Sequence, residues 1–120
     1  MVYNNVQSLL NIDQDVKHFI SSNAEISLSY SDFLEFGYNK DVEKFIYNDV
    51  ESINKNKLFK EIENKKALIC NFYLNEKCNL YIVNDFIKEI NSIMKKSNKF
   101  LMFSMSFTKK DVFKMVTFSQ

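Results

Sequence analysis

The chain has 120 residues, which is enough for one domain with a single hydrophobic core. Its sixteen basic residues are all lysine and oppose fifteen acidic residues, so the net charge is +1. This balance, with no arginine to clamp phosphate, argues against a nucleic-acid partner. One glycine and no proline exclude most glycine-rich phosphate-binding loops. Because no apolar run is long enough to cross a bilayer, we expect no membrane partner either.

The first predicted element is a helix over residues 3–23, where apolar residues recur near one face. Asp13 and Asp15 lie on this segment. Side chains two residues apart point away from each other on a helix, so we interpret the pair as a solubility feature and not as an acid–base couple. His18, the only histidine, has no nearby partner in a catalytic motif, which favours a structural or exposed imidazole.

Residues 25–30 alternate polar and apolar side chains. This period predicts a half-buried strand whose apolar side includes Ile26 and Leu28. Residues 31–36 then predict a short helix that is capped by its first two residues, a serine and an aspartate. The single glycine, Gly37, suits the end of that helix.

Residues 41–47 fit either a strand or the first turns of a helix. We favour a strand to about Tyr47, followed by a helix that Asn48 or Asp49 opens and that continues to Ile62. This helix would turn its apolar residues toward the core. They are Val50, Ile53, Leu58, Phe59 and Ile62.

Residues 67–94 organise the rest of the chain. The apolar run 67–73 is bounded by polar turn residues and predicts a buried strand. A helix follows, with apolar residues on one face at the spacing of a 3.6-residue repeat. They are Val83, Phe86, Ile87, Ile90, Ile93 and Met94.

The end of the chain predicts a β-hairpin. Residues 100–107 alternate in polarity, residues 108–111 form a turn, and residues 112–118 return as a partner strand. The whole pattern predicts an α+β fold. We expect a sheet of four or five strands, with the two long amphipathic helices packed on one face.

The two cysteines, Cys70 in the central strand and Cys78 before the next helix, favour reduced thiols in a cytoplasmic protein. A disulfide across the intervening loop, or half of a metal site, is the alternative, although no further histidine or cysteine follows at ligand spacing. With one histidine and no nucleophile tied to a base, we predict no catalytic site, no metal and no cofactor.

Three short stretches match the pattern of a known family. Residues 6–10 read V-Q-S-L-L, residues 68–72 read L-I-C-N-F, and residues 79–85 read N-L-Y-I-V-N-D. They resemble the V-Q-G-I/L, V-L-V-N-I and S-L-F-E-V-x-E segments of the FtsZ/tubulin superfamily. Those segments belong to its central helix, to a strand of its C-terminal domain and to the entry of the following helix. Residues 100–107 and 113–119 correspond to two later strands of that domain.

The resemblance implies that residues 1–120 form one domain similar to the FtsZ C-terminal domain. Residues 3–23 would then be a preceding helix similar to the FtsZ central helix. It also implies a mixed sheet of four or five strands, with a parallel strand pair around residues 67–73 and a closing antiparallel hairpin.

The departures from the family concern its catalytic loop. Where the family has N-x-D-x-x-D, residues 27–32 read S-L-S-Y-S-D, so only Asp32 matches. A serine hydroxyl cannot replace a carboxylate in polarising water or binding a cation. The family's glycine pair after the central strand is Leu74 and Asn75 here. With no glycine-rich phosphate loops, this chain alone should neither bind nor hydrolyse GTP.

The resemblance favours a non-catalytic assembly module that acts in bacterial cell division or filament regulation. Its protein partner would be FtsZ or a second copy, met through an interface loop with Ser27, Ser29 and Asp32. One alternative is the C-terminal part of a longer divergent FtsZ-like GTPase, in which Asp32 would belong to the water-orienting loop and be catalytic. Another is an unrelated small α+β partner-binding protein of the immunity or antitoxin type. Strand order distinguishes this last reading from the others.

Overall fold

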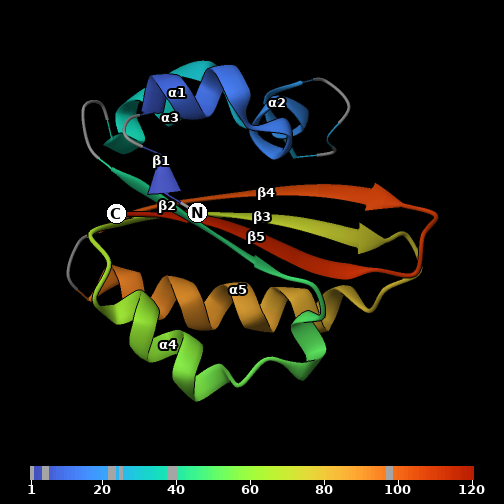
Figure 1. Cartoon of the computed structure of the whole chain (residues 1–120). Helices are drawn as coiled ribbons and strands as arrows, with labels where there is room; N and C mark the ends of the chain where they lie inside the picture. Colours follow the sequence, from blue (N-terminus) through green and yellow to red (C-terminus); the bar gives the residue numbers. More distant parts are fainter. Residues whose placement is uncertain (1, 4–5, 22–23, 25, 38–40, 97–98) are drawn as a thin grey trace.

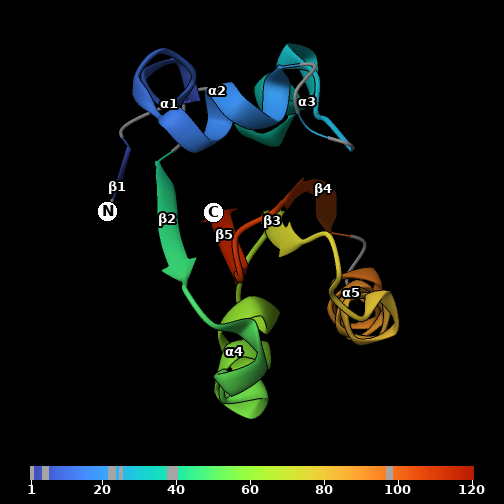
Figure 2. The same cartoon turned by 90° about the vertical axis from the view of Figure 1, so that its right-hand side faces the viewer.

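The layers of the fold are seen in a computed structural model that describes residues 2–3, 6–21, 24, 26–37, 41–96 and 99–120. A central sheet separates two layers of helices (Figures 1 and 2). One layer holds α1 (Val6–Ile12), α2 (Gln14–Ile20) and α3 (Tyr30–Gly37). The other holds the two longest helices of the described residues, α4 (Lys55–Glu63) and α5 (Leu80–Lys95). The predicted α+β fold with the long amphipathic helices on one face is confirmed.

The sheet has the spatial order β1-β2-β5-β3-β4. Its strands are β1 (Val2–Tyr3), β2 (Val42–Tyr47), β3 (Ala67–Asn75), β4 (Phe100–Thr108) and β5 (Phe113–Ser119). β3 pairs in parallel with β4, and α5 makes the connection between them that parallel strands require. The other neighbouring strands are antiparallel. The sheet is therefore mixed, and it contains the parallel pair that the resemblance implies.

The closing strands differ from the predicted hairpin in one respect. The chain does turn back after β4, but β3 lies between β4 and β5, so these two strands do not pair with each other. The short connection from β4 to β5 crosses the end of β3, where Asn75 holds it in place. The side-chain amide of Asn75 donates hydrogen bonds to the carbonyls of Lys109 and Lys110, and its backbone N–H donates to the carbonyl of Val112.

The predicted helix over residues 3–23 is wrong as one element. Tyr3 belongs to β1, which pairs with β2, and two short helices follow with a break at Asp13. Asp13 has an extended backbone, and its side chain caps α2 by accepting a hydrogen bond from the N–H of Val16 at 3.0 Å. An aspartate in this role ends one helix and starts another.

The predicted strand over residues 25–30 is also not formed as a strand in the described residues. Only Ile26 makes a bridge, to Met105 on the outer edge of β4, and α3 already begins at Tyr30. The cause is a capping box: Ser29 precedes α3, and Asp32 lies three residues later. Residues 22–23 and 25, at the ends of these two predicted elements, lie outside the described residues.

The predicted helix after Tyr47 is divided into a short 3-10 turn, Val50–Ser52, and α4. Asp49 caps the first and Asn54 caps the second, each by accepting a backbone N–H. Of the residues predicted to face inward, Val50, Leu58 and Ile62 are buried. The other two are partly buried against the same cluster.

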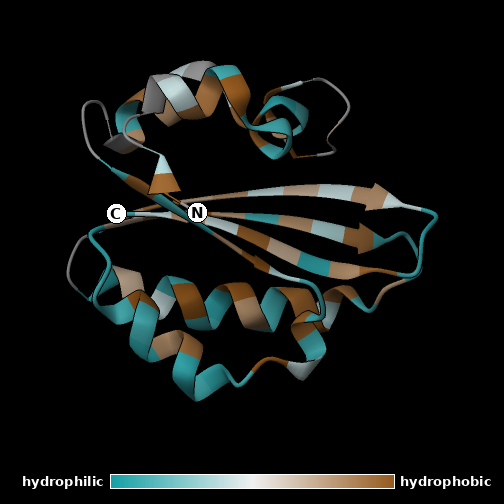
Figure 3. Cartoon of the chain, in the orientation of Figure 1, coloured by the Kyte–Doolittle hydropathy of each residue, from teal (hydrophilic) through white to brown (hydrophobic). Residues whose placement is uncertain are grey.

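The core consists of two apolar clusters, one on each face of the sheet. Hydrophobic residues run along the central strands, whereas α4 is largely hydrophilic (Figure 3). From α5 the core receives four buried side chains at helical spacing, as predicted. They are Val83, Phe86, Ile90 and Met94. Among the described residues, none of the helices combines the length and the apolar character that crossing a lipid bilayer requires.

Candidate functional site

The segment that the sequence singled out, residues 27–32, lies at the surface and includes the first turn of α3. Ser27 and Ser29 are exposed. The Asp32 carboxylate accepts the backbone N–H of Ser29 at 2.8 Å, and the Ser29 hydroxyl accepts the backbone N–H of Asp32 at 3.1 Å. The structure therefore brings Ser29 and Asp32 together as a helix cap, and the carboxylate holds the start of α3.

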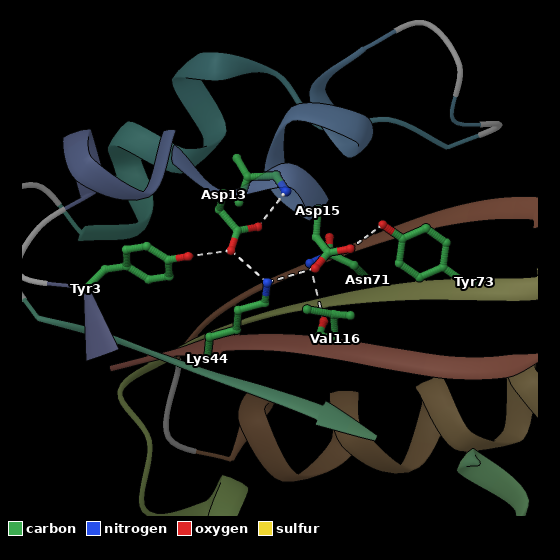
Figure 4. Close-up of polar contacts among 8 residues, drawn as sticks. Tyr3, Asp13, Asp15, Lys44, Asn71, Tyr73 and Val116 are labelled. Carbon is green, nitrogen blue, oxygen red and sulfur yellow. Dashed lines mark hydrogen bonds and ion pairs between the residues drawn. The ribbon is translucent and has the colours of Figure 1, made fainter. Parts of the chain in front are cut away.

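A more extensive polar site lies between the α1–α2 layer and the sheet, and we call it the Lys44 cluster. It consists of Tyr3, Asp13, Asp15, Lys44 and Tyr73 (Figure 4). The Lys44 ammonium donates to Oδ2 of Asp13 and to Oδ2 of Asp15, each at 2.7 Å. The Tyr3 hydroxyl donates to Asp13 at 2.7 Å, and the Tyr73 hydroxyl donates to Asp15 at 2.5 Å.

The cluster is largely removed from solvent, which sets its ionisation. Burial alone would raise the pKa of Asp15, but hydrogen bonds from Lys44 and Tyr73 outweigh it, and the pKa lies below its ordinary value. Burial alone would lower the pKa of Lys44, but its bonds to Asp13 and Asp15 raise it. Burial and then the hydrogen bond to Asp15 raise the pKa of Tyr73 far above its ordinary value. At neutral pH Asp15 is therefore a carboxylate, Lys44 an ammonium and Tyr73 a neutral phenol.

Further contacts extend the cluster along the sheet. The His18 ring stacks on Tyr73, with centroids 5.6 Å apart, and its Nε2 lies 2.8 Å from the hydroxyl of Ser106 on β4. The Lys114 ammonium lies over the Tyr73 ring, 4.7 Å from its centroid. His18 thus has the structural role that the sequence favoured, because it contacts β3 and β4 from α2.

The sequence interpretation of Asp13 and Asp15 as solubility features is wrong. The spacing argument assumed one continuous helix, but Asp13 precedes α2 and Asp15 lies in its first turn, so both side chains reach Lys44. Lys44 is about thirty residues away along the chain, on β2. Nothing local in the sequence marks that partnership, although the break in the helix could have been suspected from aspartate as a capping residue.

The two cysteines are free thiols. Cys70 is fully buried under α5, and this burial raises its pKa well above the ordinary thiol value. Cys78 is partly exposed, and burial also raises its pKa. Among the described residues, no group of three or more histidine, cysteine, aspartate or glutamate side chains is arranged to hold a metal ion. Because both cysteines are free, the disulfide that the sequence left open as an alternative is not formed.

An apolar groove lies where α5 begins, beside the outer edge of β4. It has a volume of about 500 Å³, and we call it the α5 groove. Tyr81 is 81% exposed, and Leu80 and Ile26 are each about half exposed. Met105 and Phe107 of β4 also line it. Ile26 directly precedes residues 27–32, so the groove lies next to the capped loop described above.

Comparisons with known proteins detect a likeness only in structure. No family model matches the sequence, and no curated protein matches it either. An FtsZ dimer from M. jannaschii, described as empty, is similar in structure with a TM-score of 0.62 and 9% sequence identity. The match covers 95% of this chain and 37% of the FtsZ chain. Thiamine monophosphate kinase from Aquifex aeolicus is less similar, with a TM-score of 0.47 and 12% identity. That match covers 91% of this chain and 40% of the kinase chain.

The FtsZ match confirms the predicted resemblance at the level of the fold. The chain spans little more than a third of the FtsZ chain, and it has the mixed sheet with a parallel pair that was expected of the C-terminal domain. Function does not follow from a fold that very different sequences share. The fold of this chain is like that of the FtsZ C-terminal domain.

Proposed function

We propose that this chain is a non-catalytic assembly module that binds an FtsZ-type protein through the surface formed by the α5 groove and residues 27–32. The observation that carries the proposal is the exposure of large apolar side chains around this groove, next to the loop that the family resemblance assigns to a subunit contact. Apolar patches rimmed by polar residues are typical of protein–protein contact surfaces.

The composition of the surface supports this proposal. Leu80, Tyr81 and Ile26 contribute apolar area at the mouth of the groove. The exposed hydroxyls of Ser27 and Ser29 lie on the adjoining loop. An apolar centre of this kind supplies most of the binding energy in an interface, and a polar rim excludes water from it.

The state of the polar groups supports a role without catalysis. The Asp32 carboxylate is engaged in capping α3, and the carboxylates of the Lys44 cluster are bound to an ammonium and to phenols. A catalytic carboxylate needs access to its substrate or water. We therefore expect a flat GTP titration with this chain alone, and binding would show the proposal to be wrong on this point.

A second candidate is that the domain works within a longer FtsZ-like GTPase. The observation that favours it is that the match covers only 37% of the FtsZ chain. In that case Asp32 would orient the hydrolytic water for a neighbouring subunit, in addition to capping α3. GTP turnover that is lost in Asp32→Ala of the longer gene product, with its assembly kept, would favour this candidate.

The leading proposal is tested by co-sedimentation with FtsZ from the same source. We expect the chain to pellet with the polymer, or to change polymer mass, at micromolar concentration. Tyr81→Asp should abolish the effect. It should leave the fold intact, since its side chain is exposed and an acidic residue in the first turn suits the helix dipole.

A control is Ile12→Lys, which places a charge on another exposed apolar side chain, at the end of α1, where a cation suits the helix dipole. It should bind as the unmodified chain does. Sedimentation velocity of the chain alone measures self-association. Self-association abolished by Tyr81→Asp would replace FtsZ by a second copy as the partner. No co-sedimentation together with no self-association would reject the assembly proposal.

A further inference from the structure

A second hollow lies between α4 and the underside of the sheet, and we call it the α4 hollow. Its volume is about 250 Å³. Leu58 and Ile62 of α4 and Leu68 of β3 form its apolar walls. It is separate from the α5 groove, because β2 and β5 border it instead of β4. This volume is slightly below that of pockets that bind drug-sized ligands, so it suits a smaller molecule.

The hollow exists because small polar residues occupy the sheet where α4 crosses it. Thr117 and Ser119 of β5 point to this face, and the register pairs them with Phe45 and Glu43 of β2. Phe45 is still partly exposed, so it does not fill the space. Larger apolar residues at the two β5 positions would have closed the gap beneath α4.

Ser119 gives the second, independent observation. Its side chain is 2% exposed, and its Oγ has no hydrogen-bond partner among the described residues. A buried hydroxyl without a partner is costly, and native proteins rarely keep one without a reason. Because Ser119 lines the hollow, a molecule bound there could supply the missing partner.

The rim of the hollow selects the charge of that molecule. Glu43 and Glu61 contribute two carboxylates, and Lys65 contributes one ammonium, so the rim carries a net charge of −1. The Lys65 ammonium lies 3.4 Å from the Glu43 carboxylate, at a partly exposed position. The pair is therefore weak and open to competition from a second cation.

We propose that the α4 hollow binds a small primary amine with an apolar or aromatic body. Its ammonium would donate to the carboxylates of Glu43 and Glu61 and to the hydroxyl of Ser119. Residues that face each other across neighbouring strands have Cβ atoms about 5 Å apart, so one ammonium can reach Glu43 and Ser119 together. The body of the amine would lie against Leu58 and Ile62. An ammonium has three N–H donors, which matches these three acceptors.

The probe is phenethylamine, titrated into the full chain and followed by amide chemical shifts. We expect saturable shifts in β5 and α4. The neutral analogue 2-phenylethanol should bind at least tenfold more weakly, because it lacks the charge that the rim selects. Shifts that do not saturate, or that fall outside these elements, would overturn the proposal.

Two variants locate the binding. Ser119→Val narrows the hollow and removes the hydroxyl, and it should weaken phenethylamine binding at least tenfold. Glu61→Gln should weaken it several-fold. Its matched control is Glu63→Gln, also on α4 but outside the hollow, which should leave binding unchanged. Since both glutamates are exposed, this pair decides the matter even if the valine variant fails to fold. Equal binding by all three variants would show that the amine does not occupy the hollow.

Discussion

Replacing Lys44 with methionine removes the ammonium of the Lys44 cluster and keeps most of the apolar stem. The Asp13 side chain is 1% exposed and the Lys44 side chain is 10% exposed, so the two carboxylates would lose their counter-ion in a site that water hardly reaches. Removing one partner of a buried ion pair costs about 3–5 kcal/mol of folding stability. Asp13 keeps its bonds from Tyr3 and Val16, so we expect about 3 kcal/mol, the lower end of that range.

The stability cost of Lys44→Met should also depend on pH, in a direction that the pKa shifts define. The pKa of Asp15 is lower in the folded state, so its contribution to stability is present above the unfolded pKa of about 3.9 and is lost as the pH falls. Without Lys44, burial instead favours the protonated acid. The stability difference between the unmodified chain and Lys44→Met should therefore be largest near neutrality and shrink toward about pH 4. At alkaline pH the contribution of Lys44, whose pKa is raised on folding, is fully present below the unfolded pKa of about 10.4 and is lost as the pH rises through the raised value.

Urea unfolding followed by circular dichroism, at neutral pH and near pH 4.5, measures both effects. Lys65→Met is the matched control, because its ion pair with Glu43 is 3.4 Å long and partly exposed. Exposed pairs contribute about 0–1 kcal/mol. If the two methionine variants cost the same, or if the cost of Lys44→Met does not shrink in acid, the Lys44 cluster is not the buried charge pair that the contacts indicate.

Three further predictions test single contacts. Ser29→Ala should cost about 1 kcal/mol in urea unfolding, since it removes one half of the capping box of α3; no measurable loss would argue against the cap. Asn75→Ala should cost about 1 kcal/mol by releasing the connection that crosses the end of β3; a stability within error of the unmodified chain would contradict that role. In the native protein a thiol reagent should label Cys78, faster at higher pH, and reach Cys70 only after denaturation, because burial raises the pKa of both thiols and Cys70 is enclosed; equal labelling rates would refute this.

The elements that the sequence predicted correctly are those with long, regular patterns. In α5, four apolar side chains at helical spacing are all buried, as the periodicity requires. The run around residues 67–73 became β3, which is buried on both faces of the sheet. In such elements many residues express the same preference, so a single misleading residue changes little.

The elements that failed were each divided or displaced by one polar side chain that caps a helix. Asp13 broke the N-terminal helix, and Ser29 began α3 inside the predicted strand. The alternation of that strand was misleading, since Leu28 is buried from an irregular segment whereas Ile26, assigned to the same side, is half exposed. Over six residues, an alternating pattern does not distinguish a strand from a loop with one anchored side chain.

The Lys44 cluster and the α4 hollow could not be predicted from the sequence, for a different reason. The Lys44 cluster depends on pairs separated by 29 and 31 residues, and the α4 hollow depends on the register of β2 against β5. Neither follows from local spacing, because both need the topology first. The capped loop was found, since its serines and aspartate are contiguous in the sequence, but its carboxylate binds the backbone of its own chain.

The likeness to FtsZ at 9% identity has a physical basis that also limits its meaning. A fold of this kind is specified by where apolar side chains recur and by how the strands are connected, and many sequences satisfy both conditions. Buried positions on α5 and β3 follow from those conditions alone. The exposed Tyr81 beside the α5 groove and the unpaired Ser119 within the α4 hollow do not, since an apolar core gains nothing from either. Activity specific to this chain should therefore be sought at those two positions before the buried ones.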